Sequence, residues 1–208
     1  MQNSEASGFT KIVIVFAIVI AILATYFIMT AGSSNKPLAG QGASIGKADI
    51  GGEFSLMDQD GKPFSNKQLK GKLSLIYFGF TFCPDICPAS LQKLTAVMDT
   101  LDKYKIDVTP VFITIDPKRD TPASLKAYLG HFHRKFIGLT GKPEEIKEVA
   151  DKFKVYYAVA HGSDLNRNDY LLDHTSLVYL MDKNGEYMAH FHIDSDPETM
   201  IEYIRIHR

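Results

Sequence analysis

The sequence predicts an α/β domain with a mixed central sheet, and three observations support this prediction. Two mainly apolar runs, at 73–80 and 108–116, have the length and composition of strands buried on both faces. Segments with the periodicity of amphipathic helices alternate with these strands. Turn signals for β-hairpins lie at both ends of the domain, at Asp60-Gly61 and Asn184-Gly185. Helices between buried strands, with hairpins at the flanks, predict parallel and antiparallel strands in one sheet.

The first predicted elements are a hairpin, a buried strand and a helix. Residues 52–65 (GEFSLMDQDGKPFS) alternate around the Asp-Gly turn and predict an N-terminal β-hairpin, and residues 73–80 (LSLIYFGF) predict the first buried strand. Pro88 has a fixed backbone angle that suits the first turn of a helix, so we expect a helix to begin there. The apolar residues of this helix fall on one stripe, which consists of Leu91, Leu94, Val97, Met98 and Leu101.

The remaining predicted elements repeat this alternation and end in a second hairpin. Thr121-Pro122 predicts the start of a helix that extends to about Phe132, because threonine caps helices and proline suits their first turn. Asp196-Pro197 predicts the start of a terminal helix for the same reason. The other predicted elements are a strand at 108–116, a short strand at 136–140, an amphipathic helix at 142–155 and a hairpin over 175–193.

The N-terminus predicts a membrane anchor. Residues 12–29 form an apolar run of eighteen residues without a charge. About 20 helical residues cross a hydrocarbon core of roughly 30 Å, whereas the apolar core of a cleavable signal peptide spans only about 7–15 residues. Residues 29–34 (MTAGSS) offer only a loose cleavage box. We therefore favour a single uncleaved transmembrane helix over a cleaved signal.

The segments around this span predict the topology of the chain. The flank at 1–11 is too short for a domain and has no arginine, which argues against a mitochondrial presequence. We expect a bacterial inner-membrane protein with a short cytoplasmic flank and its domain in the periplasm. Residues 30–48 are rich in Gly, Ser and Ala and predict a flexible linker, and residues 49–208 predict the domain. The formal net charge of -1 provides no basic field for nucleic acid.

The two cysteines of the chain, Cys83 and Cys87, lie where the first buried strand turns into the helix. Residues before proline avoid the helical region, so we expect Cys87 just outside the helix that Pro88 begins. There the helix N-terminus favours a thiolate, which is both the nucleophile of disulfide exchange and a soft ligand for Cu(I). The spacing allows a structural disulfide, a redox dithiol or a metal site. Structural zinc is less favoured, because only two of its four ligands could be thiols.

A third metal ligand would be a histidine, and His174 is the favoured candidate. Residues 171–180 (LLDHTSLVYL) place it at the start of the penultimate strand, after a long loop. In thioredoxin-like folds the corresponding loop faces the active cysteines and usually carries a cis-proline, but no proline occurs between residues 144 and 196. A histidine in the position of that proline favours a metal ligand over a groove for disulfide exchange.

The other histidines are weaker candidates for a metal ligand. His190 and His192 share one face of a predicted strand, which is more often solvated than metal-binding. His131 and His133 follow a predicted helix, and we expect both at the surface, where the helix C-terminus favours their charged form.

Three motifs occur in order along the domain, namely TFCPDICP (81–88), FITIDPKRDTP (112–122) and DHTSLVYLMDKNGEY (173–187). Together they resemble the SCO/SenC family of copper-binding cytochrome c oxidase assembly proteins. The resemblance covers about residues 50–208, and a membrane anchor with a short tether matches the family as well. It implies a thioredoxin-like fold with inserted elements.

The resemblance also implies a copper site. The residues that match the copper ligands of the family are Cys83, Cys87 and His174. Two thiolates and one imidazole form a soft donor set suited to Cu(I), and we expect that Cu(II) binds as well. The same two cysteines are close enough to form a redox disulfide. Asp85 and the loop Asp116–Asp120 match the family too, although the sequence assigns them no role.

Two functions that use the same cysteines follow from the resemblance. The first is a membrane-anchored copper chaperone that delivers copper to subunit II of cytochrome c oxidase, with a periplasmic copper donor as a further partner. The alternative is a thiol–disulfide reductase that keeps the cysteines of that subunit reduced, so enzymatic activity stays open. His174 discriminates between them, because copper binding needs it and disulfide exchange does not. A peroxiredoxin-like peroxidase is disfavoured, because the expected proline and activating arginine are missing.

The membrane anchor leads to a first prediction. If residues 12–29 remain as a transmembrane helix, the protein stays in the membrane fraction after washing with alkaline carbonate. Protease added to spheroplasts then digests the domain at 49–208, and immunoblotting of the fractions checks both results. A processed form in the soluble fraction would instead indicate a cleaved signal peptide.

Overall fold

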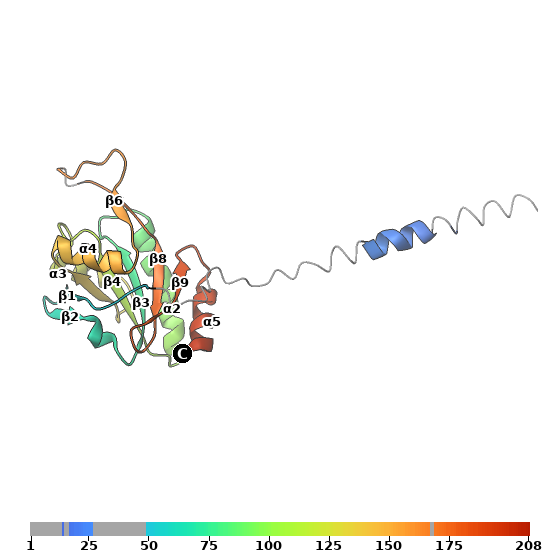
Figure 1. Ribbon diagram of the computed structural model, residues 1–208, viewed down its shortest axis with the longest axis horizontal. Helices are drawn as coiled ribbons and strands as arrows, with labels where there is room; N and C mark the ends of the chain where they lie inside the picture. Colours follow the sequence, from blue (N-terminus) through green and yellow to red (C-terminus); the bar gives the residue numbers. More distant parts are fainter. Residues whose placement is uncertain (1–13, 15–16, 27–48, 167–168) are drawn as a thin grey trace, which may run out of the picture. The chain divides into compact units, whose positions relative to one another are not determined.

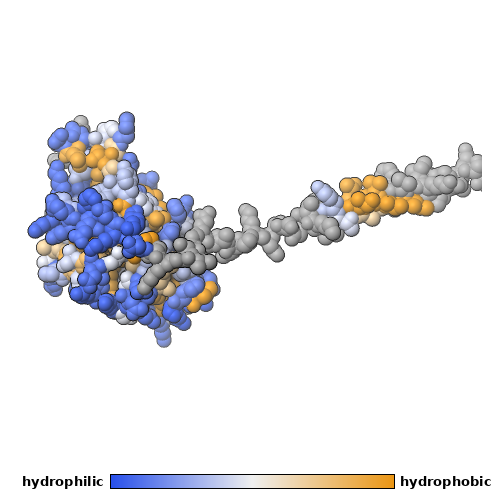
Figure 2. Space-filling model, in the orientation of Figure 1, coloured by the Kyte–Doolittle hydropathy of each residue, from blue (hydrophilic) through white to orange (hydrophobic). Residues whose placement is uncertain are grey.

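The computed structural model describes residues 14, 17–26, 49–166 and 169–208. The chain divides into two units, Met1–Gln41 and Gly42–Arg208. In the first unit residues 17–26 are helical, and Figure 2 shows hydrophobic residues along them. Within the described part of the chain, no helix has both the length and the apolar character needed to cross a membrane. The predicted anchor lies partly outside the described residues, and the predicted flank at 1–11 and linker at 30–48 lie entirely outside them.

The second unit is built on a seven-stranded sheet (Figure 1). In spatial order its strands are β2 (Pro63–Ser65), β1 (Ser55–Asp58), β5 (Ile137–Thr140), β4 (Val108–Thr114), β3 (Leu73–Gly79), β8 (Leu177–Met181) and β9 (Tyr187–His192). β3, β4 and β5 run parallel, whereas β8 pairs antiparallel with β3, and β1 pairs antiparallel with β5. The hairpins β1–β2 and β8–β9 form the two edges. The predicted mixed sheet and both predicted hairpins are confirmed.

Helices cover both faces of this sheet. They are α2 (Ile86–Lys103), α3 (Pro122–Leu129), α4 (Pro143–Lys152) and α5 (Pro197–His207), with a short 3₁₀ turn η1 (Asn66–Leu69). Because successive strand residues point to opposite faces, Tyr77 and Phe78 of β3 mark the two sides. Phe112 pairs with Tyr77 and contacts Tyr128 of α3, and α5 packs on α2 on this same side. Phe78 contacts Phe153, which follows α4 on the other side.

The sequence explains where the helices begin and what they bury. The predicted apolar stripe of α2 is fully buried and comprises Leu91, Leu94, Val97, Met98 and Leu101. Thr121 accepts a hydrogen bond from the Ser124 amide, and Asp196 accepts one from the Glu198 amide, so both predicted N-caps are confirmed. α3 ends at Leu129 rather than at about Phe132, since the chain leaves the helix at Gly130.

The start of α2 corrects one expectation about the cysteines. The helix begins at Ile86 with Asp85 at the N-cap, so Cys87 lies inside the first turn rather than just outside it. Pro88 falls within that first turn, where backbone amides have no partner in the helix and a missing N–H costs nothing. The bias of a residue before proline is therefore overridden at Cys87, and its own amide donates to the sulfur of Cys83.

A second, two-stranded sheet was not predicted. It consists of β6 (Tyr157–Val159) and β7 (Leu172–His174), which pair antiparallel. His174 therefore ends β7 instead of beginning β8. The connection between β6 and β7 projects from the domain (Figure 1), and it carries exposed apolar residues that include Leu165 and Leu171. Figure 2 shows hydrophobic residues gathered in this projection.

Candidate metal centre

The cysteine pair lies at the carboxyl end of β3, in the centre of the sheet. The chain leaves β3 at Gly79, turns through residues 80–85 and enters α2. In this turn the amide of Cys83 donates to the carbonyl of Phe80 (3.3 Å), and the amide of Cys87 donates to Cys83 Sγ (3.5 Å). Both cysteines are buried free thiols, and Cys87 is completely inaccessible. The backbone of the turn and of the helix therefore holds the two sulfurs on one side of the junction.

Gly79 makes room for this arrangement. A Cβ at this position would lie 2.8 Å from Cys87 Sγ, and no real Cβ approaches a neighbour that closely. It would also meet the rings of Phe112 and Tyr77, at 3.0 and 3.1 Å. The absence of a side chain at the end of β3 thus lets the first turn of α2, with Cys87, pack directly on the strand.

His174 faces the buried cysteine from the end of β7. Its Nε2 lies 3.5 Å from Cys87 Sγ, and its Nδ1 lies 3.0 Å from the carbonyl oxygen of Thr175. A carbonyl oxygen can only accept a hydrogen bond, so in the neutral form of the ring the proton lies on Nδ1. Nε2 then presents a lone pair to the cysteines. Edge-on contacts with Tyr77 and Phe80, with ring centroids 6.2 and 6.0 Å away, hold the imidazole in this orientation.

The electrostatics of the site separate the two thiols. A hydrogen bond from the side chain of Cys87 holds the pKa of the Cys83 thiol well below its usual range, and the amides of Cys87 and Asp85 act in the same direction. The hydrogen bond with Cys83 raises the pKa of the Cys87 thiol, and burial raises it further. The Tyr77 hydroxyl donates to Cys87 Sγ at 3.8 Å. These opposite shifts favour a thiolate at Cys83 and a protonated thiol at Cys87.

This donor set is chemically soft. Two sulfur donors and one imidazole suit Cu(I), and the amides at the start of α2 favour negative charge on the sulfurs. Among the residues that the structure describes, no three His, Cys, Asp or Glu side chains form a ready metal-binding group. The structure places the three predicted ligands at one end of the sheet, where the Cys87 amide donates to Cys83 Sγ and Cys87 Sγ contacts the imidazole of His174. Their binding of a metal stays a prediction.

The second-choice ligands have other contacts. His190 stacks on Tyr187, and its Nδ1 lies 2.5 Å from the hydroxyl of that residue. His192 is exposed, and its Nδ1 lies 4.0 Å from Asp194. Both histidines lie on β9, at one edge of the sheet, whereas the cysteines follow β3.

The expected surface position is right for His131 and wrong for His133. His133 is buried, with Nε2 3.5 Å from Asp102 and 3.7 Å from Asp99, both on α2. The contact between the residues after α3 and the side of α2 therefore buries a histidine that the local sequence suggested was solvated.

Sequence reasoning assigned no role to the loop between β4 and α3, yet this loop lies beside the site. Asp120 is fully buried and accepts hydrogen bonds from Thr81 N (3.0 Å), Thr81 Oγ1 (2.5 Å) and Thr114 Oγ1 (2.6 Å). Burial raises the pKa of Asp120, and the hydrogen bonds from Thr114 and Thr81 oppose that shift. This loop lies within the motif at 112–122, but its hydrogen bonds to Thr81 join residues far apart in the chain and were not predicted from the sequence.

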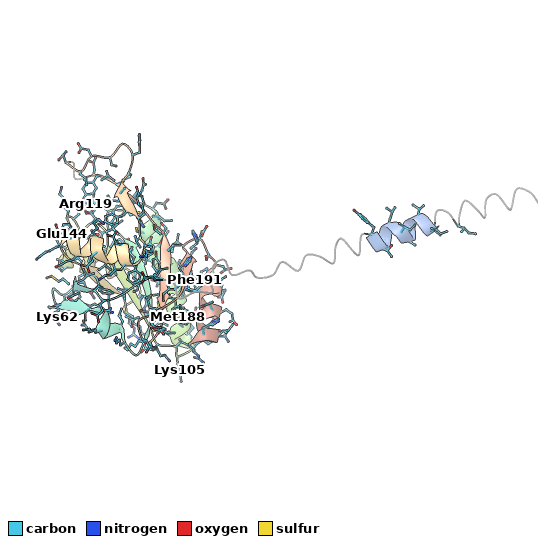
Figure 3. All side chains as sticks on the ribbon, in the orientation of Figure 1. Lys62, Lys105, Arg119, Glu144, Met188 and Phe191 are labelled. Carbon is cyan, nitrogen blue, oxygen red and sulfur yellow. The ribbon has the colours of Figure 1, made fainter. Side chains whose placement is uncertain are left out.

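The same loop also contacts the segment that leads to His174. Asp116 accepts hydrogen bonds from the hydroxyl of Tyr170 (2.5 Å) and from Arg119. Arg119 donates to the carbonyl of Tyr170 (2.9 Å), and its guanidinium lies 3.5 Å from the centre of the Tyr170 ring. Figure 3 shows Arg119 close to the projecting connection between β6 and β7. Neither Arg119 nor Tyr170 was singled out from the sequence, because the contacts of Tyr170 with Arg119 and Asp116 join segments about fifty residues apart in the chain.

Fold and site together define a thioredoxin-like α/β domain with a cysteine pair opposite a histidine at the end of the central strand. A family model described as SCO1/SenC matches residues 42–207. The chain belongs to the SCO1/SenC family, as its motifs indicated.

Known relatives share both the sequence and the fold. A SCO2-like protein of Rickettsia conorii is 55% identical over 200 residues, which cover 96% of this chain and 97% of the relative. A crystal structure of yeast Sco1 with copper bound has a TM-score of 0.71 at 44% identity, over 76% of this chain and 88% of that chain. BsSco, described as a member of the Sco family of cytochrome c oxidase assembly proteins with a disulfide switch, has a TM-score of 0.61 at 26% identity, over 76% of this chain and 94% of that chain.

The different pKa values of the two thiols lead to a second prediction. In the reduced, metal-free protein, iodoacetamide should modify Cys83 first at about pH 6, because a thiolate is the nucleophile and Cys87 keeps its proton. The rate should change little between about pH 5 and 8, whereas an ordinary thiol of pKa about 8.5 gains roughly tenfold per pH unit there. Mass spectrometry of peptides checks the site. Initial modification of Cys87, or a tenfold rise per unit, would contradict the assignment.

Proposed function

We propose that this protein is a copper chaperone that binds copper through Cys83, Cys87 and His174 and delivers it to cytochrome c oxidase during assembly. The observation that carries the proposal is the position of His174 Nε2, held 3.5 Å from the sulfur of Cys87 at the end of β3 while Nδ1 faces the carbonyl of Thr175. The copper-bound structure of yeast Sco1, a relative with the same fold, supports the choice of metal. Copper is then the cargo of the protein and not a resident cofactor.

The protonation of the site suits reversible binding of Cu(I). A thiolate at Cys83 receives the ion, and the proton of Cys87 leaves as its sulfur becomes the second ligand. The lone pair of His174 supplies the third bond without any change of tautomer. With three soft donors the coordination number of Cu(I) is low, so a thiolate of the acceptor protein can approach and bind the ion.

We further propose where delivery takes place. Residues 12–29 anchor the protein in a bacterial inner membrane, residues 30–48 tether the domain, and the domain lies in the periplasm. A tether of this length and composition gives the domain a reach of roughly 25 Å, by the scaling for flexible linkers. The acceptor is the copper site of oxidase subunit II, and a periplasmic copper donor loads the chaperone. BsSco is described as a member of a family of cytochrome c oxidase assembly proteins, and this supports cytochrome c oxidase as the client.

A thiol–disulfide reductase is the second candidate, and one observation favours it. Cys83 has the lowered pKa of an attacking thiol, and Cys87 lies next to it as a resolving thiol. Such a dithiol reduces a disulfide of its client by giving up two electrons and two protons. Cys83 and Cys87 are themselves oxidised to a disulfide. The disulfide switch described for BsSco accords with this chemistry.

A third prediction concerns the redox state of the pair. The oxidised domain should carry a Cys83–Cys87 disulfide and bind Cu(I) at least about tenfold more weakly than the reduced domain, because a disulfide sulfur is a poor ligand. Competition with a chromophoric Cu(I) chelator measures both affinities, and mass spectrometry confirms the disulfide. Equal affinities for the two forms would remove the cysteines from the site.

A fourth prediction uses His174 to separate the two candidate functions. The His174→Ala variant should lose about 10–100-fold or more in copper affinity, since losing even an outer partner of a ligand costs that much. The two thiols remain, and a thiolate is the nucleophile in disulfide exchange. The rate at which the variant reduces a model disulfide should therefore stay within a few-fold of the wild-type rate. Copper competition, a disulfide-exchange assay and oxidase assembly in cells provide the three readouts.

The matched control is His190→Ala, which removes an imidazole that pairs with Tyr187 on β9. It should leave copper affinity unchanged. Weakened copper binding with normal oxidase assembly in the His174→Ala strain would favour the reductase over the chaperone. Unchanged copper binding in that variant would exclude His174 as a ligand.

A further inference from the structure

The loop between β4 and α3, residues 115–121, contacts both halves of the candidate metal centre. The cysteines and the histidine come from segments far apart in the chain, and this loop packs against each of them. We propose that it acts as a clamp that sets the distance between the cysteine turn and His174, with Asp120 as the positioning residue on the cysteine side and Asp116 on the histidine side. The proposal rests on the proposed function where Cu(I) affinity is used to test it.

On the cysteine side, the contact is made through Thr81. Both the amide and the hydroxyl of Thr81 donate to the Asp120 carboxylate, at 3.0 and 2.5 Å, and Thr81 lies two residues before Cys83. Thr114, the last residue of β4, donates to the same carboxylate at 2.6 Å. The turn that carries Cys83 is thus tied to the end of the neighbouring strand by charged hydrogen bonds, which are stronger than neutral ones.

On the histidine side, the contact is made through Tyr170, which lies four residues before His174. Its hydroxyl donates to Asp116 at 2.5 Å, and its carbonyl accepts from Arg119 at 2.9 Å. Lys118 adds a bond to the carbonyl of Leu165, at 3.1 Å, in the projecting connection. One short loop therefore restrains the beginning of the cysteine turn and the strand that ends in His174.

The composition of the loop is difficult to explain by stability alone. Asp116 and Asp120 are both buried, at 4% and 0% exposure, and burying a carboxylate is costly unless hydrogen bonds compensate it. Apolar residues of similar size often stabilise a fold as well or better. Besides bonds with Thr114 and Arg119, these two carboxylates accept hydrogen bonds from the segments that carry the sulfurs and the imidazole. Metal ligands generally depend on such outer partners for their orientation.

Two substitutions of nearly equal size test the cysteine side. Thr81→Val removes the hydroxyl that joins the cysteine turn to the Asp120 carboxylate. Thr140→Val removes a buried hydroxyl that donates to the backbone carbonyl of the same Asp120, at 2.8 Å. Both variants lose one hydrogen bond to Asp120, but only the first loses a connection to the cysteines. Thr81→Ser keeps the hydroxyl and serves as the rescue variant.

The full-length protein in detergent is measured in two ways. Competition with a chelator gives the Cu(I) affinity, and equilibration with glutathione buffers gives the position of the dithiol–disulfide equilibrium without any copper. Thr81→Val should weaken Cu(I) binding by about 10–100-fold and shift the glutathione equilibrium, as expected for an outer partner of the ligands. Thr140→Val and Thr81→Ser should match the wild type in both. Tyr170→Phe, which removes the bond to Asp116, should weaken Cu(I) binding while leaving the glutathione equilibrium near that of the wild type.

The outcomes distinguish the clamp from the copper function. If Thr81→Val and Thr140→Val have the same Cu(I) affinity and the same dithiol–disulfide equilibrium, the proposed clamp on the cysteine side is wrong, even if all variants bind copper. If the wild type itself binds no Cu(I), the proposed function fails, and the glutathione equilibrium alone decides the clamp. If Thr81→Val does not fold, Tyr170→Phe decides it through copper affinity, and wild-type affinity in that variant would overturn the proposal.

Discussion

The contact between the sulfur of Cys87 and Nε2 of His174 is the interaction on which the site depends. It joins residues 87 positions apart in the chain, from α2 and from β7. Its chemistry is defined from both sides, because the carbonyl of Thr175 selects the tautomer with a proton on Nδ1, and the hydrogen bond with Cys83 and burial both raise the pKa of the Cys87 thiol. A soft pair of donors, a buried thiol and a partly buried imidazole, is thereby held next to Cys83. Copper binding and disulfide chemistry both begin from this arrangement.

The sheet supplies the rigidity that this contact needs. β3 is buried along its whole length and pairs with β4 on one side and β8 on the other. α2 packs on β3 through a stripe of fully buried side chains. Burying each of these side chains stabilises the fold by about 1.5–3 kcal/mol. Gly79 then permits the close approach of the helix to the strand. The cysteines are positioned by the core, whereas His174 lies on a smaller sheet outside it and depends more on loop contacts.

The sequence predicted those elements whose signals are local. Alternation around Asp60-Gly61 and Asn184-Gly185 marked the hairpins, and Thr121 and Asp196 marked helix starts that the structure confirms. The cysteine pair was recognisable because it stands at a junction between a buried strand and an amphipathic helix. Its exact placement was not, since the first turn of α2 tolerates Pro88 and so includes Cys87.

Features that depend on tertiary contacts were missed. The pairing of β6 with β7 joins two segments without strong alternation, and it moves His174 to the end of a strand. His133 is buried because α2 provides Asp102 beside it, a relation that no local pattern contains. The hydrogen bonds of Asp120 likewise run to Thr81, 39 positions earlier in the chain. His174 was nevertheless found from the sequence, because it occupies a position where related folds place a different residue.

In the proposed site, two thiol sulfurs and one imidazole nitrogen converge on a single copper ion. X-ray absorption spectroscopy of the reduced protein loaded with one equivalent of Cu(I) measures the ligands of that ion directly. We predict a first shell of two sulfur scatterers and one nitrogen scatterer, with the outer-shell pattern of an imidazole ring. A shell of sulfur alone, or one without sulfur, would contradict it.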